Sequence, residues 1–137
     1  MTTRLSNASQ IAAADAVVDQ LNAAAGTLKI YTGTQPADAD TEPAGTLLVT
    51  ITLAAPAYGA ANASGTAALL GTPLSGTAAA TGTAGCFQVE TNGGTINVFQ
   101  GSVTATGGGG DLTVDNVSIA TGQTVNVSAL NFTVPAG

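Results

Sequence analysis

Residues 46–53 have the sequence TLLVTITL, and this stretch decides the fold class. Its alternate positions form two sets, Leu47, Val49, Ile51 and Leu53 on the one hand and Leu48, Thr50 and Thr52 on the other. A period of two with β-branched residues is typical of a strand that is buried on one face. The all-apolar set therefore predicts the side of the strand that faces a core.

A β-hairpin is predicted further along the chain. Asn92-Gly93-Gly94 lies between two alternating runs at residues 86–91 and 95–103. Asn-Gly between such runs is the strongest short-range hairpin signal, because both turn residues must adopt positive φ. In this hairpin the residues expected to share a face are Phe87 with Val89 and Ile96 with Val98.

Turn residues divide the rest of the C-terminal part into further short strands. The glycine run at residues 107–110 has no lysine and no helical pattern after it, so it predicts a mobile turn rather than a phosphate-binding loop. In the last run, residues 124–134, the apolar positions change register near Ala129. This change predicts a bulge or a bend at that point.

Before residue 26 the apolar period is that of a helix. Ile11, Ala14, Val18 and Leu21 follow at spacings of three or four residues, with polar residues such as Gln10 between them. We expect a helix over residues 6–25 that packs through these four side chains onto the sheet that begins with Leu28 and Ile30.

The ends and the polar face of this helix have their own signals. Ser6 or Asn7 is expected to cap its first turn, and Gly26 to provide a left-handed residue after its end. Asp15 and Asp19 are four residues apart on the polar face, and we interpret them as solvated rather than as a pair for acid–base chemistry.

Together these patterns predict a mainly β protein. About eight short strands follow one N-terminal helix, spaced roughly 8 to 12 residues apart, which is typical of a sandwich, jelly roll or partly open barrel. We expect a single domain over residues 1–137, with the helix at 6–25 and a β-sandwich, jelly-roll-like part at 27–134.

The composition excludes most chemistry. The 137 residues include 27 Ala, 22 Thr and 18 Gly, and the formal net charge is −6 from 8 acidic and 2 basic residues. Without histidine there is no Ser-His-Asp or Cys-His constellation and no imidazole zinc site. We therefore expect no enzyme, and no catalytic or cofactor-binding residue. With only Arg4 and Lys29 as basic residues, nucleic-acid binding is not expected either.

Two weaker signals concern metal binding and thiol chemistry. Asp38, Asp40 and Glu42 alternate like the start of a calcium loop, but Pro43 and Val49 stand where the loop needs glycine and a bidentate glutamate. We interpret this segment as a solvated acidic loop and predict no metal site. The single cysteine, Cys86, is expected to be a buried or half-buried strand residue, because free cysteine behaves mostly as a small hydrophobe.

The N-terminal residues do not have the pattern of a signal peptide, since Asp15 interrupts the first apolar stretch. No run approaches the roughly 18 apolar residues of a membrane span. We expect synthesis in the cytoplasm and no membrane partner.

Several stretches distributed over nearly the whole chain resemble a group of small structural proteins of tailed bacteriophages. The stretches that carry the resemblance are Arg4-Leu5-Ser6-Asn7-Ala8, Gly26-Thr27-Leu28-Lys29-Ile30-Tyr31-Thr32-Gly33, Gln35-Pro36-Ala37-Asp38-Ala39-Asp40-Thr41, residues 47–52, Pro56-Ala57-Tyr58-Gly59-Ala60-Ala61 and residues 118–125. This chain has Cys86-Phe87-Gln88 where such proteins often carry Trp-Phe and a charged residue.

The resemblance implies a virion protein. A small, acidic β protein with few basic residues is similar to capsid decoration or cement proteins, which bind the outer shell and stabilise contacts between capsomers. The expected partners are then the major capsid protein and copies of the chain itself in a homo-oligomer, without nucleic acid, membrane or small-molecule substrate. The expected place is the capsid exterior, after synthesis in the host bacterium. The alternative is a tail, baseplate or fibre-associated β-sandwich module for host attachment.

The segment between Glu42 and Glu90 contains no charged residue. A surface without charges has little protection against association, so we expect this segment to contribute contacts between subunits.

Overall fold

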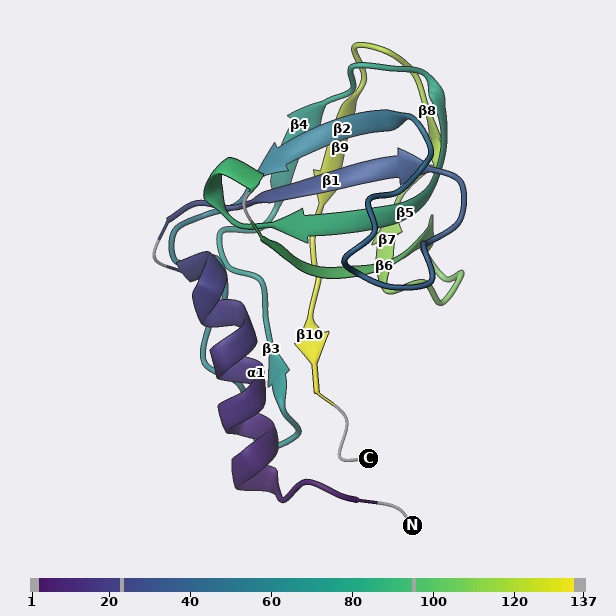
Figure 1. Ribbon diagram of the computed structural model, residues 1–137. Helices are drawn as coiled ribbons and strands as arrows, with labels where there is room; N and C mark the ends of the chain where they lie inside the picture. The colour runs from purple at the N-terminus through teal and green to yellow at the C-terminus, as the bar shows by residue number, and fades with distance from the viewer. Residues whose placement is uncertain (1–2, 23, 95, 135–137) are drawn as a thin grey trace.

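The computed structural model describes residues 3–22, 24–94 and 96–134, and this part is mainly β, with one α-helix and ten strands (Figure 1). The elements in chain order are α1 (Asn7–Asn22), β1 (Thr27–Thr32), β2 (Leu47–Thr52), β3 (Thr66–Ala67), β4 (Leu74–Thr77), β5 (Gly82–Glu90), the 3-10 turn η1 (Asn92–Gly94), β6 (Asn97–Ala105), β7 (Leu112–Val114), β8 (Ser118–Ile119), β9 (Thr124–Val127) and β10 (Phe132–Thr133). The predicted mainly β class is confirmed. The structure has ten strands rather than about eight, and three of them, β3, β8 and β10, contain only two residues each.

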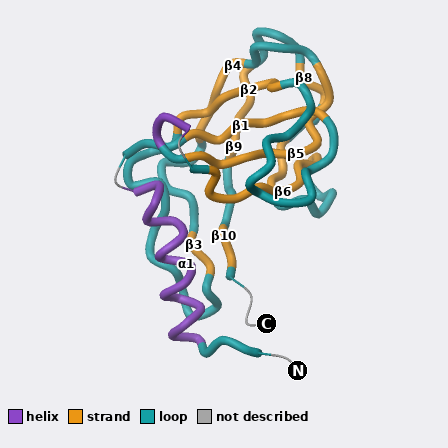
Figure 2. The backbone as a smooth tube through the Cα atoms, viewed as in Figure 1, coloured by secondary structure: helices purple, strands orange, loops and turns teal. Residues whose placement is uncertain are grey.

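The strands form one curled sheet and two ribbons. The main sheet has the order β2-β1-β5-β6-β7, with β8 paired to the start of β5, while β4 pairs with β9 and β3 with β10. Ribbon β4–β9 bridges the two ends of the curled sheet, because β4 lies beside β2 (Figure 2) and β9 contacts β7. The β part therefore approaches a closed barrel around one apolar core.

Strand β2 follows the predicted alternation only in part. Val49, Ile51 and Leu53 are buried as expected, but Leu47 is exposed and Leu48 is buried. The cause is a β-bulge: Ile30 of β1 pairs with Val49 and Tyr31 pairs with Leu47. Leu48 is the extra residue at this shift and turns inward, which no alternating pattern predicts.

The hairpin between β5 and β6 is confirmed. The two strands pair antiparallel, and Gly93 and Gly94 adopt positive φ. Phe87 and Val89 are both buried, but the expected shared face for Ile96 and Val98 is wrong. Ile96 precedes β6 and is 48% exposed, while Val98 packs against the core. A register shift between Val89 and Glu90 of β5 interrupts the regular alternation that would have placed Ile96 and Val98 on one face.

Helix α1 lies alongside β3 and β10, below the curled sheet in Figure 1. Ser6 caps it, because its Oγ accepts a hydrogen bond from the Ser9 N–H at 3.2 Å. Ala14, Val18 and Leu21 are buried as predicted, but the fourth buried position is Gln10 rather than Ile11. The side-chain amide of Gln10 has a hydrogen-bond partner at this buried position, because it donates to the Val134 carbonyl at 3.0 Å.

The C-terminal half of α1 anchors the chain that follows β2. Asp15 accepts a hydrogen bond from the Ala61 N–H at 2.7 Å, so the interpretation of this carboxylate as merely solvated is wrong. Asn22, the last helical residue, accepts from the N–H groups of Ala57 and Tyr58. The predicted end at residue 25 is also wrong, since Ala24 and Ala25 form a turn; residue 23 lies outside the described part.

Gly26 is needed for close approach rather than for a left-handed conformation. It is not among the glycines with positive φ. A Cβ at this position would collide with the carbonyl oxygen of Glu90 and with the Leu21 side chain. The prediction of a left-handed cap at Gly26 was therefore wrong, although glycine is still required.

The glycine run at 107–110 connects β6 to a parallel neighbour, β7, over only a few residues. Such a connection is unusually short, because parallel strands are normally joined by a dozen or more residues. The run folds back over Thr104, whose Oγ accepts from the Gly110 N–H at 2.9 Å. Gly107 and Gly109 have positive φ, so glycine serves this reversal directly.

The register change near Ala129 is confirmed as a break between β9 and β10. Val125, Val127 and Leu130 are nevertheless all buried in the core. Within the described ranges, no helix has the length and apolar character needed to cross a membrane.

Candidate functional site

The outer face of the main sheet carries polar side chains in matching register. Strand pairing places Thr50, Lys29, Gln88 and Gln100 in one row across β2, β1, β5 and β6. The neighbouring row contains Thr52, Thr27, Glu90 and Asn97. Side chains alternate between the faces of a strand, so the apolar partners such as Phe87 and Val89 point to the core and these rows point away from it.

Two of these polar residues are buried although they face away from the core. Gln88 is 1% exposed and Glu90 is 5% exposed. The loop between β1 and β2 covers part of this face and is tied to it by two hydrogen bonds. Gln100 Nε2 donates to the Thr41 carbonyl at 2.7 Å, and the Tyr31 hydroxyl lies 3.3 Å from Glu42 Oε1.

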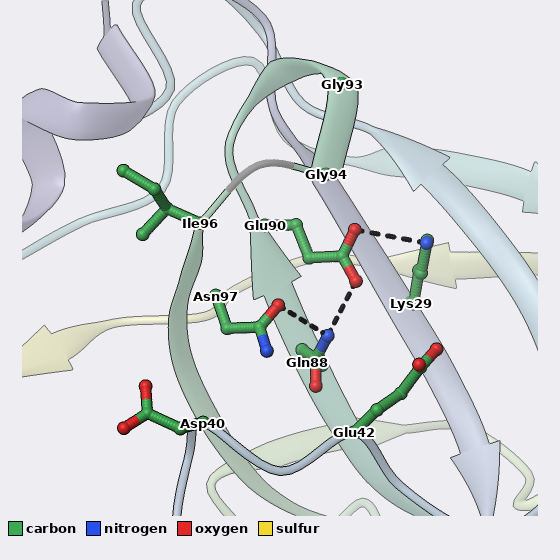
Figure 3. Close-up of a pocket in the computed structure, with 9 residues that line it drawn as sticks. All are labelled: Lys29, Asp40, Glu42, Gln88, Glu90, Gly93, Gly94, Ile96 and Asn97. Atoms are coloured by element: carbon green, nitrogen blue, oxygen red, sulfur yellow. Dashed lines mark hydrogen bonds and ion pairs between the residues drawn. The ribbon is translucent and has the colours of Figure 1, made fainter.

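Gln88 is the centre of the network (Figure 3). Its Nε2 donates to Glu90 Oε1 at 2.6 Å and to Asn97 Oδ1 at 2.9 Å. Its Oε1 accepts from Gln100 Nε2 at 2.7 Å. The other oxygen of Glu90 forms an ion pair with Lys29 Nζ at 3.1 Å. These partners compensate the burial of Gln88 and Glu90, as buried polar groups require.

Beside this network lies a hollow of about 680 Å³. It is lined by Lys29, Asp40, Glu42, Gln88, Glu90, Gly93, Gly94, Ile96 and Asn97. Figure 3 shows Glu42 on the side of Lys29 and Asp40 on the side of Asn97. Carboxylates, amides and one ammonium group can exchange hydrogen bonds with a polar ligand rich in hydroxyl groups.

The covering loop changes the chemistry of Tyr31. Burial and the neighbouring Glu42 carboxylate raise the pKa of the Tyr31 hydroxyl to about 12. Cys86 lies opposite Tyr31 in the sheet and is fully buried, as predicted, and burial raises the pKa of its thiol. Both groups are therefore held in their neutral forms at physiological pH.

We expect Tyr31 to make the fold sensitive to alkaline pH. Its pKa is higher in the folded state than the ordinary value of 10.0, so its stabilising contribution is complete below about pH 10 and is lost as the pH rises toward about 12. Between these values the free energy of unfolding should fall more steeply for the wild type than for Tyr31→Phe. Urea unfolding of both proteins at pH 8, 10 and 11 measures these free energies of unfolding, from slopes that are usually about 1–3 kcal/mol/M in urea. If the free energy of unfolding fell equally with pH in the wild type and in Tyr31→Phe, the prediction would be contradicted.

The acidic segment has a different role at each of its three residues. Asp38 closes its own turn by accepting from the N–H and the hydroxyl of Thr41 at 2.9 and 2.8 Å. Asp40 and Glu42 are exposed, as predicted for a solvated acidic loop, and they also line the hollow. Among the residues that the structure describes, no three His, Cys, Asp or Glu side chains are placed to hold a metal ion.

Sequence reasoning singled out Asp40 and Glu42 only as part of a weak calcium-loop signal, and it predicted neither Gln88 nor Glu90 as a site residue. The sequence nevertheless contained a signal for these two residues. Gln88 and Glu90 alternate with the apolar Phe87 and Val89, so both polar side chains belong to the face of the strand opposite the core. Comparison with protein-family models, curated proteins and solved structures gives no match for this chain.

Proposed function

We propose that this chain is a structural protein of a tailed bacteriophage virion, a capsid decoration or cement protein that binds the outer shell and associates with copies of itself. The proposal starts from the resemblance of its sequence to small phage structural proteins. The observation that carries it in the structure is a surface without charge on β2 and β4.

That surface is built from the segment between Glu42 and Glu90. Strands β2 and β4 lie side by side and expose hydroxyl side chains, Thr50 and Thr52 on β2 and Ser75 and Thr77 on β4. Leu47 and Leu70 of the same segment are exposed as well. A neutral surface of this kind loses little solvation when a protein partner covers it, whereas a charged surface would resist burial.

The second candidate is a tail, baseplate or fibre-associated module for host attachment. The polar hollow beside Gln88 favours it, because amides and carboxylates can bind the hydroxyl groups of a glycan. The position in the particle discriminates between the two. Electron microscopy of particles should find the chain distributed over the capsomers of the head if it is a cement protein. Confinement to one vertex or to the tail would favour the attachment module.

We expect Thr77→Lys to reduce the occupancy of this protein on particles. Thr77 is exposed on β4, so the folded subunit should tolerate lysine, but burying the new ammonium group at a contact without a partner is costly. Ala12→Lys is the matched control, since Ala12 is exposed on α1 outside the neutral surface. Occupancy is measured on particles assembled with each variant, after both have been shown to fold. Equal occupancy for both variants would place the contact elsewhere.

A further inference from the structure

A second hollow, of about 290 Å³, lies between β6 and the C-terminal strand β10. Its apolar part is formed by Phe87, Phe99, Leu130 and Phe132. The ring of Phe99 lies 5.0 Å from that of Phe132 and 6.0 Å from that of Phe87, measured between centroids. Phe99 and Phe132 are only half-buried, so aromatic surface remains open to a partner.

Two polar features border these rings. Strand β10 pairs with β3 along one edge, and no strand of the described part pairs with its other edge, while residues 130–133 line the hollow. Asp111 also lines it and is held in place through one oxygen, Oδ2, which accepts from the N–H and the hydroxyl of Ser102. Asp111 itself is exposed, and no cation among the described residues pairs with it.

The N-terminal residues have the complementary properties. Residues 3–5 precede α1 without regular structure, and Figure 1 shows them leaving the start of the helix on the side away from the curled sheet. Leu5 is 40% exposed. The only described ion pair uses Lys29, so Arg4 is the one other basic residue of the chain and has no carboxylate partner in the described part.

We propose that residues 3–5 of one copy bind the Phe-lined hollow of a second copy. Leu5 then covers the rings of Phe99 and Phe132, Arg4 pairs with Asp111, and the extended backbone runs along the free edge of β10. One arm and one hollow per chain allow two copies to exchange arms and close a two-fold dimer. This inference rests on the self-association in the proposed function and names the contact that produces it.

Charge reversal tests the Arg4–Asp111 pair directly. In Arg4→Glu and in Asp111→Arg, each chain carries like charges on its arm and its hollow, so each variant alone should dimerise less than the wild type in sedimentation velocity. An equimolar mixture should restore the dimer, because both arm-to-hollow contacts in the mixed dimer then join opposite charges. Restoration by mixing is a result that a merely misfolded variant cannot produce.

Two further variants separate packing from charge. Leu5→Ser should weaken the dimer about tenfold through loss of apolar burial, which corresponds to about 1.4 kcal/mol. Asp111→Asn keeps an oxygen for Ser102 and removes only the charge, so it should weaken the dimer without changing the thermal stability of the monomer. Thr3→Ser is the control for a change in the arm, and it should leave the dimer unaffected.

Two outcomes would overturn the inference. A wild type that stays monomeric at high concentration would exclude arm exchange between copies. This holds even if the arm of each chain binds the hollow of the same chain. An oligomer that survives Arg4→Glu and Leu5→Ser would exclude this contact but leave the self-association of the proposed function in place.

Discussion

Leu21→Asp is expected to destabilise the protein by about 4 kcal/mol or more, which is a large fraction of the stability of a domain of this size. Leu21 is completely buried in the core cluster that contains Leu28 and Ile30. Aspartate removes the apolar side chain and buries a carboxylate in an apolar core. The expected result is loss of cooperative thermal unfolding, measured by circular dichroism at neutral pH.

The matched control is Ala12→Asp on the exposed side of the same helix. It introduces the same charge and a similar loss of helix propensity, so it should cost less than about 1 kcal/mol. If Leu21→Asp and Ala12→Asp melted at the same temperature, burial of Leu21 would contribute nothing and the helix would not be part of the cooperative fold.

Local patterns were sufficient for the main elements of this fold. The helical spacing of Ala14, Val18 and Leu21 and the hairpin signal at residues 92–94 each depend on neighbours close in the sequence, and the structure confirms the helix and the hairpin. The residues with positive φ in the turn are Gly93 and Gly94 rather than Asn92 and Gly93. Leu48 and Gln10 could not be placed in this way. Leu48 is buried because β1 and β2 pair with a bulge, and Gln10 because it meets the Val134 carbonyl, more than a hundred residues away in the chain.

The candidate site was beyond sequence reasoning for the same reason. Its central residue, Gln88, has partners on the same strand and on the neighbouring strand, Glu90 and Gln100. The covering loop then closes over this face through Thr41 and Glu42. Strand register and the placement of the loop are both set by long-range contacts, which local sequence patterns do not contain. The composition, with few charged residues, indicated only that catalytic groups are scarce and gave no indication of a buried polar network.

The ion pair between Lys29 and Glu90 gives the second large expected effect. Lys29→Met should lower the free energy of unfolding by about 2–3 kcal/mol. The Glu90 side chain is 6% exposed, so without Lys29 its charge stays buried against Gln88, and no other cation of the described residues pairs with it. We place the effect below the cost of breaking a fully buried pair because the Lys29 side chain is 26% exposed and water can partly replace it. Urea unfolding at pH 7 measures the loss.

The double variant Lys29→Met, Glu90→Gln decides whether that loss comes from the stranded charge or from the missing lysine stem. Glutamine keeps an oxygen that can accept from Gln88 Nε2, and it carries no charge. The double variant should therefore recover more than half of the stability lost in Lys29→Met, although it has one more substitution. A double variant that is as unstable as Lys29→Met would mean that the lysine stem stabilises this face by packing and that the buried charge contributes little.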